Sequence, residues 1–439
     1  MGKILRHTYS VCPACLKRIP AVHVTYGQEI YLEKKCPEHG AFSAVVWRGL
    51  LDREEWTGDL PPIAEGENAN CPQACGLCPE HRQDTCCVLL EVTKRCNLHC
   101  PFCFAAGGAG EDIPLAIVKE RLQALAVPNQ TLVQLSGGEP TVRDDLPEIV
   151  AAAREAGCRY VQLNTNGLRL AEDESYVRSL AEAGLSFVFM QFDGMDDKIY
   201  RTLRGRDLLD IKRRAIDNCA RHNLGVTLVP TLVPQVNTQD IGKIIRFAVS
   251  QSPAVRGVHF QPVSYFGRFP VLPTDDKRFT LDELLTAIAE QAGSLVPQDS
   301  LLPSRCDHPL CGFHGDYIVM PDQSLYPLHR RQINCCGTTT ADQNRSFIAR
   351  RWQRQKTGAA AEPEASSDFA SFDGFLRRLR THSFTLTAML FQDAGNLDLE
   401  RLRRCSLHVF DDGRFVPFCA YYLTSHKAAP AWANMVHNG

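Results

Sequence analysis

Three cysteines stand close together at Cys96, Cys100 and Cys103, directly after the apolar run 88–92. Three thiols on one short loop can bind three irons of a cubane iron–sulfur cluster, while the fourth iron finds no local thiolate and stays open for a ligand. Short cysteine spacings also occur at zinc sites, usually as paired Cys-x-x-Cys, and among buried thiols. The triplet, named here the cysteine loop (residues 96–103), favours an iron–sulfur cluster with a reactive corner.

A second motif, Ser136-Gly137-Gly138-Glu139-Pro140, follows a strand predicted at 130–135. Two glycines expose backbone at a strand end, so that a ligand can approach closely, and the Glu139 carboxylate can take an ammonium group. Alone, Gly-Gly-Glu-Pro also fits a plain turn. Its place behind the cysteine loop favours a ligand site.

Together these motifs resemble the radical S-adenosylmethionine (SAM) superfamily. Its signature is Cys-x3-Cys-x2-Cys with an aromatic residue before the last cysteine, and the stretch from 86 to about 262 resembles its core. The resemblance implies reductive cleavage of SAM to a 5′-deoxyadenosyl radical, which abstracts hydrogen from an unactivated carbon. It assigns a catalytic 4Fe–4S cluster to Cys96, Cys100 and Cys103, and SAM contacts to Phe102, Gly137, Gly138 and Glu139.

Short apolar runs alternate with helical patterns from residue 86 onward, which predicts a parallel sheet with crossover helices. Strands are expected near 87–93, 130–135, 159–164, 186–192, 226–232 and 256–260. Helices are expected at 115–125, 146–156, 174–183 and 208–222. The fold class is α/β, a partial (β/α)6 TIM-like barrel, which the resemblance also implies. In such barrels chemistry lies at the carboxyl ends of the strands.

Polar side chains follow the third and fourth predicted strands. Such groups can hydrogen-bond a ribose or a substrate, although Asn-Gly and Asp-Gly also serve plain turns. We expect Asn164 and Gln191 to contact the cofactor and Thr165 to contact the substrate. The run from 193 to 205 is similar to molybdenum-cofactor and peptide-modifying branches of the superfamily. Further candidates for hydrogen bonding or proton transfer, with a structural role as the alternative, are His259, Tyr265 and His314.

The N-terminal region carries the pairs Cys12/Cys15 and Cys36/His39 around a predicted hairpin. Ligand pairs at the ends of a hairpin are typical of zinc ribbons and rubredoxins, which hold one tetrahedral metal. We therefore predict a zinc or mononuclear iron site. His39 could instead be a turn residue beside Gly40, which would leave the fourth ligand unassigned.

Nineteen cysteines in a chain without an apparent signal peptide indicate metal rather than disulfides. One auxiliary cluster, or a zinc site, is expected at Cys71, Cys75, Cys78 and Cys86, with Cys87 as an alternative to Cys86. A second is expected at Cys306, Cys311, Cys405 and Cys419, because an Asp-Gly turn at 412–413 predicts a hairpin that brings the last two together. Cys158 and Cys219 are expected in the core, and Cys335 and Cys336 are left open.

Composition fits an ordinary globular protein: 439 residues, 44% hydrophobic and 22% charged, with a net charge of −2. There is no basic footprint for nucleic acid, no apolar run that could span a bilayer, and no signal peptide or myristoylation motif. The cytoplasm is the expected location. We predict a ribbon module at 1–57, a cysteine-rich linker at 58–85, a barrel at 86–290 and a cysteine-rich C-terminal extension at 291–439. A low-complexity linker is expected at 355–368.

The order of all these pieces resembles the tetraether lipid synthase-like branch of the superfamily, over nearly the full chain. That resemblance implies C–C bond formation on a lipid or another apolar substrate, a reductant such as flavodoxin or ferredoxin, and peripheral membrane contact as an open alternative. The segment 391–398 is less aromatic than in that branch, which leaves the substrate open. Alternatives are a radical SAM methylase or cyclase of a small heterocycle, and a non-catalytic iron–sulfur electron-transfer protein.

Overall fold

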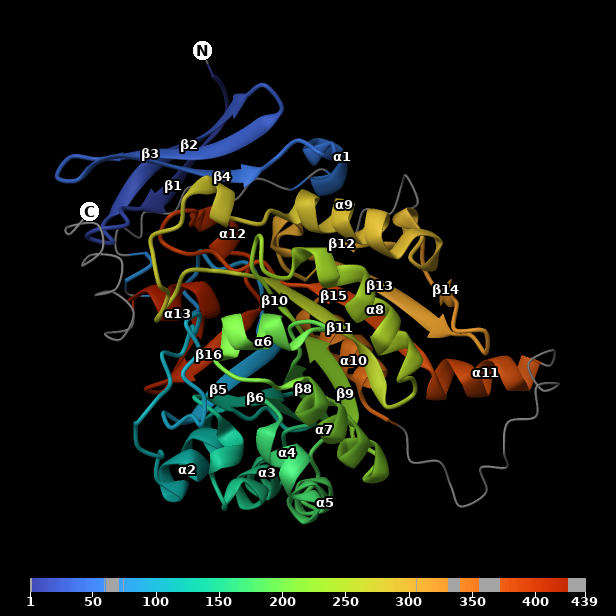
Figure 1. The fold of residues 1–439 in the computed structure, drawn as a ribbon. Coiled ribbons are helices and arrows are strands. Elements are labelled where there is room, and N and C mark those ends of the chain that lie inside the picture. The colour runs from blue at the N-terminus through green and yellow to red at the C-terminus, as the bar shows by residue number, and fades with distance from the viewer. Residues whose placement is uncertain are drawn as a thin grey trace.

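The computed structural model describes residues 2–58, 60, 71–73, 75–304, 306–330, 340–354 and 372–424 (Figure 1). The predicted linker 355–368, nearly all of 59–70, and Cys335 and Cys336 lie outside these residues.

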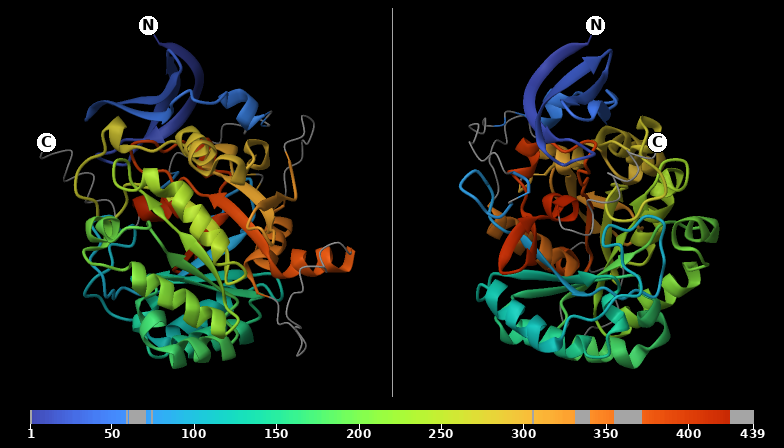
Figure 2. Two further views of the ribbon diagram at one scale, coloured as in Figure 1. Left: turned by 45° about the vertical axis from the view of Figure 1, so that its right-hand side comes forward. Right: turned by 90° about the vertical axis from the view of Figure 1, so that its left-hand side faces the viewer.

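Six parallel strands form the centre of the molecule, as predicted. They are β5 (Cys87–Thr93), β6 (Leu132–Gly137), β7 (Tyr160–Thr165), β8 (Phe187–Gln191), β9 (Gly225–Val229) and β11 (Val255–Pro262), each paired with the next. Helices follow the strands: α2 (Leu115–Leu125), α3 (Leu146–Glu155), α4 (Leu168–Glu172), α5 (Glu174–Glu182), α6 (Asp197–Arg204), α7 (Leu209–Arg221), α8 (Ile241–Ser250) and α9 (Leu281–Ala292). Figure 2 shows the helices outside the curved sheet, as apolar strand faces require.

The C-terminal extension continues this sheet at both edges. β15 (Ser383–Ala388) runs parallel to β11, and β13 (Phe313–Val319) pairs antiparallel with β15. At the other edge β16 (Leu407–Asp411) runs parallel to β5 and forms a hairpin with β17 (Arg414–Pro417), which confirms the turn predicted at 412–413. The short strands β10 (Thr231–Leu232), β12 (Leu302–Pro303) and β14 (Leu325–Pro327) pair with β11, β13 and β13. Residues beyond 290 therefore share one sheet with the barrel.

Helix α10 (Ala341–Trp352) lies across the amino ends of the central strands. Its Ala349 and Trp352 pack with Leu132, Tyr160 and Phe187, the first residues of β6, β7 and β8. These rings and methyl groups bury apolar surface inside the barrel. The amino-terminal mouth is thereby covered, and the carboxyl ends of the strands stay available for a site. The other C-terminal helices are α11 (Phe372–Thr381), α12 (Leu399–Leu402) and α13 (Phe418–Thr424).

The N-terminal module is an antiparallel sheet in chain order, β1 (Lys3–Val11), β2 (Arg18–Tyr26), β3 (Glu29–Cys36) and β4 (Gly40–Trp47), followed by α1 (Arg53–Thr57). It packs on the C-terminal extension through buried polar contacts. Asp398 accepts from Thr8 at 2.7 Å and lies 3.0 Å from His23, while Lys34 donates to the Ala394 carbonyl at 2.7 Å. The sequence analysis anticipated only the central hairpin of this sheet.

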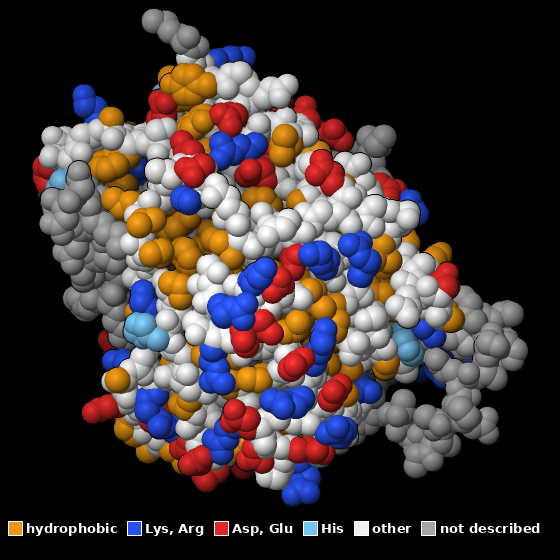
Figure 3. Space-filling view, viewed as in Figure 1, with side chains coloured by type: hydrophobic (Ala, Val, Ile, Leu, Met, Phe, Trp, Pro, Cys, Tyr) orange, Lys and Arg blue, Asp and Glu red, His pale blue; other side chains and the backbone are white. Residues whose placement is uncertain are grey.

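The surface carries no single-sign charge field on the face shown in Figure 3, where basic and acidic side chains alternate. This agrees with the net charge of −2. None of the helices in the described ranges combines the length and the apolar character that crossing a bilayer requires.

Candidate functional site

A cavity of about 880 Å³ occupies the inside of the barrel, at the upper end of the size range of ligand pockets. Side chains that point inward from β5 to β9, from β11, and from β13, β15 and β16 line it. The cavity reaches from the cysteine loop, which follows β5, to Gln343, Asn344 and Trp352 of α10. One continuous space therefore joins the predicted cluster loop to the closed end of the barrel.

The cysteine loop is fixed by backbone hydrogen bonds. Cys96 N–H donates to the Gly108 carbonyl at 3.0 Å, and Cys103 exchanges backbone bonds of 2.9 and 3.0 Å with Arg268. The Arg268 guanidinium also donates to the Cys100 carbonyl at 2.7 Å. Arg268 comes from the segment after β11, so sequence spacing gave no sign of its role.

All three thiols of the loop face the cavity. Burial raises the pKa of Cys96 to about 11. Three thiols on one rigid loop, turned to one enclosed space, are a donor set that fits a cubane cluster with one open iron. The expected aromatic neighbour, Phe102, also lines the cavity, and its ring meets Tyr265 edge-on with centroids 6.3 Å apart.

Gly137 and Gly138 lie directly against the protein backbone, a role that the sequence did not suggest. A Cβ at Gly137 would lie 2.2 Å from the Thr93 carbonyl oxygen, and one at Gly138 would lie 2.1 Å from that of Arg95. Real Cβ atoms do not approach backbone so closely, and Gly137 also has φ +130°. The two positions therefore require glycine because the backbone just before the cysteine loop lies against them. A ligand in the cavity would be a second reason.

Glu139 is buried, and protein donors already engage its carboxylate. Oε1 accepts from the Thr141 amide at 3.1 Å and hydroxyl at 2.5 Å and from the Thr165 hydroxyl at 2.6 Å, while Oε2 accepts from the Asn166 amide at 2.6 Å. Four donors match the acceptor capacity of a carboxylate. Glu139 thus ties the strand ends of β6 and β7 together. Thr165 lines the cavity and donates its hydroxyl to this carboxylate, and its expected contact with substrate stays a prediction.

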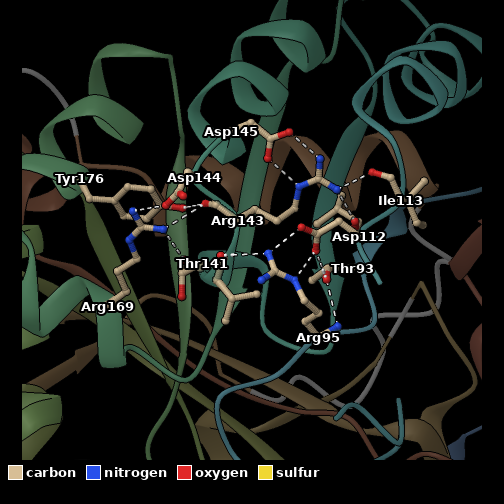
Figure 4. A network of polar contacts seen from close by, with 12 residues as sticks. Thr93, Arg95, Asp112, Ile113, Thr141, Arg143, Asp144, Asp145, Arg169 and Tyr176 are labelled. Carbon is tan, nitrogen blue, oxygen red and sulfur yellow. Dashed lines mark hydrogen bonds and ion pairs between the residues drawn. The ribbon is translucent and has the colours of Figure 1, made fainter. Parts of the chain in front are cut away.

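Arginines outside the cavity fix the cysteine loop and the Gly-Gly-Glu turn in place (Figure 4). Arg143 donates to the carbonyls of Val92 at 2.7 Å and Ile113 at 2.5 Å and forms a two-bond pair with Asp145. Arg95, directly before the first loop cysteine, pairs with Asp112 at 2.6 and 2.9 Å. Paired guanidinium and carboxylate groups give fixed geometry as well as energy. We name the segments so held (93–104, 136–141 and 164–166) the cysteine-loop wall.

Arg204 and Asp193 form a buried ion pair beside this wall, with two bonds of 2.7 Å. Arg204 lines the cavity and interacts with Cys100. Gln191, an expected cofactor contact, also lines the cavity, and its amide oxygen accepts from Arg204 at 3.1 Å when turned toward it. Asn164, the other expected contact, lines the cavity and accepts from Gln162 at 2.6 Å.

Another part of the cavity surface is polar and comes from strands distant in sequence. Its members, named the polar wall, are His259 of β11, His314 and Asp316 of β13, and Thr385 and Thr387 of β15. Asp316 stands directly opposite Thr385, and Thr387 is paired with both His314 and His259. Burial lowers the pKa of His259 to about 4, so the ring is neutral at pH 7. The two histidines are candidates from the sequence, whereas no motif in the sequence pointed to Asp316.

Two of the residues expected to hydrogen-bond or transfer protons, His259 and Tyr265, bond to other groups of the protein. His259 Nδ1 lies 2.8 Å from the Thr387 hydroxyl, and Tyr265, outside the polar wall, donates its hydroxyl to the Lys277 carbonyl at 2.7 Å. Burial raises the pKa of Tyr265 to about 12. Neither geometry indicates a free proton donor, which agrees with the structural alternative weighed for these residues.

The N-terminal sheet brings its four predicted ligands together. The ligand atoms of Cys12, Cys15, Cys36 and His39 all lie within 4.8 Å of one another. His39 Nδ1 is 3.7 Å from the Cys12 sulfur and 3.5 Å from the Cys36 sulfur, so His39 belongs to the group. Three thiols and one imidazole suit a tetrahedral zinc or iron ion.

The remaining cysteines include the two auxiliary ligand sets that the sequence predicts. Cys86, expected with Cys71, Cys75 and Cys78, has its sulfur 3.8 Å from that of Cys87 and shares a buried cluster with Cys306. Burial raises the pKa of Cys405 well above its usual range, with further contributions from Asp307, Cys419 and Cys311. The division into two sets of four stays a prediction. Cys158 and Cys219 are buried in the main core, as expected.

Comparison with protein families gives two matches. The model described as the Radical SAM superfamily matches residues 90–248, and the model described as the HMPTM N-terminal zinc ribbon domain matches residues 4–48. The first match covers the cysteine loop and the part of the cavity lined by β5 to β9, and the second covers the four-ligand sheet.

Relatives of known function cover different shares of the chain. A 7,8-dihydro-6-hydroxymethylpterin dimethyltransferase of Methanocaldococcus jannaschii is 33% identical over 95% of this chain and 93% of its own. A PqqA peptide cyclase of Bradyrhizobium diazoefficiens is 27% identical over 71% of this chain and 84% of its own. Among solved structures, SuiB of Streptococcus suis bound to S-adenosylmethionine matches 48% of this chain and 49% of its own, with 17% identity and a TM-score of 0.39.

Proposed function

The chain belongs to the radical SAM superfamily, and from this we propose that, on the way to methylation, a 5′-deoxyadenosyl radical takes a hydrogen atom from a carbon of a pterin-type heterocycle, which gives 5′-deoxyadenosine and a carbon radical at the position to be methylated. Its cofactors are 4Fe–4S and SAM, with zinc or iron in the N-terminal ribbon. When bound, cluster and SAM supply a 5′-deoxyadenosyl radical that abstracts hydrogen from unactivated carbon. The pterin is suggested by the relative that matches nearly the full chain.

The residues of the cysteine-loop wall would hold these cofactors. We assign the catalytic cluster to Cys96, Cys100 and Cys103 and the SAM contacts to the backbone of the segment 137–139 with Asn164 and Gln191. Arg95 and Arg268 fix the loop, and Glu139 fixes the strand ends through its four hydrogen bonds. Because these groups are already ordered by the protein, little side-chain entropy remains to be lost when the cofactors bind.

One observation supports a heterocyclic substrate: the cavity that the cysteine loop lines also has an end lined by aromatic and polar side chains. Trp352 and Phe189 meet edge-on at 4.6 Å between centroids, and both line the cavity. The Trp352 indole donates to Thr385 of the polar wall at 3.0 Å. Aromatic rings next to hydroxyl, imidazole and carboxylate groups suit a flat, hydrogen-bonding substrate better than an alkyl chain.

The test is hydrogen transfer from a labelled substrate. Protein reconstituted anaerobically with iron and sulfide is given dithionite, SAM and 7,8-dihydro-6-hydroxymethylpterin deuterated at carbon. We expect methionine and 5′-deoxyadenosine to form and the deoxyadenosine to carry deuterium. Unlabelled deoxyadenosine would reject this substrate, and absence of deoxyadenosine from cluster-loaded protein would reject the radical step and favour an electron-transfer role.

A second candidate, C–C bond formation on a lipid, keeps one supporting observation. Five phenylalanines line the same cavity near the cysteine loop and the C-terminal helix α13: Phe102, Phe104, Phe266, Phe391 and Phe418. Such rings would accept an alkyl chain. A perdeuterated fatty acyl substrate in the same assay separates the candidates, because only the true substrate labels the deoxyadenosine.

The other parts of the chain fit supporting roles in this proposal. A low-potential reductant such as flavodoxin or ferredoxin would deliver the electron, in the cytoplasm, and the auxiliary cysteines would hold further clusters. We retain the boundaries at 57, 85 and 290 as a functional division into ribbon, auxiliary segment, barrel and C-terminal extension.

A further inference from the structure

Some of the charged side chains that line the cavity form hydrogen bonds or ion pairs within the protein, and one does not in the described part of the chain. Among the lining residues that the structure describes, both guanidinium groups are engaged, Arg204 with Asp193 at 2.7 Å and Arg330 with Asp299 at 2.8 Å. Two of the three carboxylates in this described lining accept hydrogen bonds, Glu139 from four donors and Asp307 from the Ser406 amide at 2.7 Å.

Asp316 is the third carboxylate of the lining. Its residue is 4% exposed, and within the ranges that the structure describes no hydrogen bond or ion pair reaches its side chain. Burying an ionised carboxylate without donors is costly, and natural interiors avoid it. Burial raises the pKa of Asp316 to about 6, with Arg351 opposing this by its charge, so the group is still mostly ionised at pH 7. A ligand that brings donors would remove the cost.

The surroundings of Asp316 restrict the shape of that ligand. Thr385, directly across from Asp316, accepts from Trp352, and Thr387, two residues on, bonds to His259. Both hydroxyls flank the carboxylate, and within the described ranges neither makes a hydrogen bond to it. The Trp352 and Phe189 rings beside them offer flat apolar surfaces. The recess suits a planar ring with hydrogen-bond donors on one edge.

We propose that Asp316 is the substrate anchor, and that its carboxylate accepts two parallel hydrogen bonds from a ring N–H and the adjacent exocyclic amino group of a 2-aminopyrimidin-4-one heterocycle. This rests on the proposed function and deepens it, because a pterin carries that edge. Two parallel N–H donors match the two oxygens of a carboxylate, as in guanidinium pairs. No bond is made or broken at this edge, so Asp316 is a positioning and specificity residue.

The test is equilibrium binding to the anaerobic, cluster-loaded protein, with 7,8-dihydro-6-hydroxymethylpterin and its analogue lacking the 2-amino group as probes. We expect Asp316→Asn to weaken pterin binding roughly 10- to 100-fold, the range of hydrogen bonds to a charged group. The wild type should bind the analogue more weakly than the pterin by a comparable factor. Asp316→Asn should show a much smaller difference in affinity between the two probes. Asp322→Asn is the matched control, because this carboxylate on the turn after β13 is exposed and accepts its hydrogen bonds from the neighbouring Ser324.

Equal pterin affinity in the wild type and Asp316→Asn would overturn the proposal, as would a wild type that binds both probes equally or neither. Iron content and the melting temperature of the variant show that it is folded, and Asp316→Ala repeats the test with the oxygen atoms removed. Failure here is separable from failure of the radical chemistry, which the wild-type deoxyadenosine assay reports independently.

Discussion

The cysteine-loop wall and the polar wall enclose one cavity, but their polar groups are satisfied differently. In the first, Glu139 is buried with four donors, and Arg95, Arg143 and Arg268 all bond to neighbouring backbone or carboxylates. In the second, Asp316 is buried without a donor in the described part of the chain. A wall that is complete in itself suits a cluster that stays bound, whereas an unpaired group suits a ligand that comes and goes.

The largest expected effect comes from breaking the cysteine-loop wall at its thiols. Cys100→Ala should abolish 5′-deoxyadenosine formation, because one iron of the catalytic cluster loses its ligand. The ribbon metal, held by its own four ligands, should remain and be measurable as bound zinc or iron. Cys158→Ala, at a buried thiol of the core, is the control. Retained deoxyadenosine production in the Cys100 variant would remove the assignment.

Glu139→Gln should weaken the same wall through its hydrogen bonds. A glutamine keeps one acceptor and sets an amide donor against groups that are themselves donors, so charge-assisted bonds are lost. We expect the free energy of unfolding, measured by chemical denaturation, to fall by about 2–3 kcal/mol, together with SAM affinity. Glu148→Gln on the exposed side of α3 should change neither. An unchanged stability in Glu139→Gln would show that the four bonds contribute little.

Asp316→Asn should have the opposite sign on stability. The pKa of Asp316 is raised from 3.8 to about 6, so its ionised form is penalised in the folded state, and the penalty is full above pH 6 and absent below pH 4. Removing the charge should leave the free energy of unfolding at pH 7 unchanged or raise it, by at most about 3 kcal/mol at 1.36 kcal/mol per unit. A clear loss of stability would mean that the carboxylate has a partner within the protein.

The smallest expected effect is on the pH dependence of pterin binding. With a pKa of about 6, the ionised fraction of Asp316 falls roughly fourfold between pH 7.5 and pH 5.5, and affinity should fall with it. His259 stays neutral over this range, since its pKa is about 4, and Arg351 stays charged. Titration calorimetry at several pH values checks this. The same slope in Asp316→Asn would assign the titration to another group, with His314 of the polar wall the first to examine.

The two walls also differ in how far the sequence predicted them. The six barrel strands, the cysteine loop and the Gly-Gly-Glu turn were found because each is a local pattern: a period, a spacing or a turn at a strand end. The four ribbon ligands likewise lie at the ends of one local sheet, and they come together as expected.

What the sequence did not predict depends on pairing between distant strands. Asp316 reaches the cavity only because β13 pairs with β15 and β15 with β11, and no spacing announces this register. The contact between Cys86 and Cys306 also joins segments far apart in the chain. The sequence placed Glu139 at the end of β6, as the structure does. It did not show the four hydrogen bonds to its carboxylate, because their donors are three residues that follow two different strands.

The division of the cavity is tested most directly by measuring SAM and dihydropterin binding to the same anaerobic Asp316→Asn protein. The account predicts that SAM binds as in the wild type while pterin binding falls roughly 10- to 100-fold. Loss of SAM binding with pterin binding intact would contradict it, because the polar wall would then belong to the cofactor and the substrate would have to be sought at the phenylalanine-lined part of the cavity.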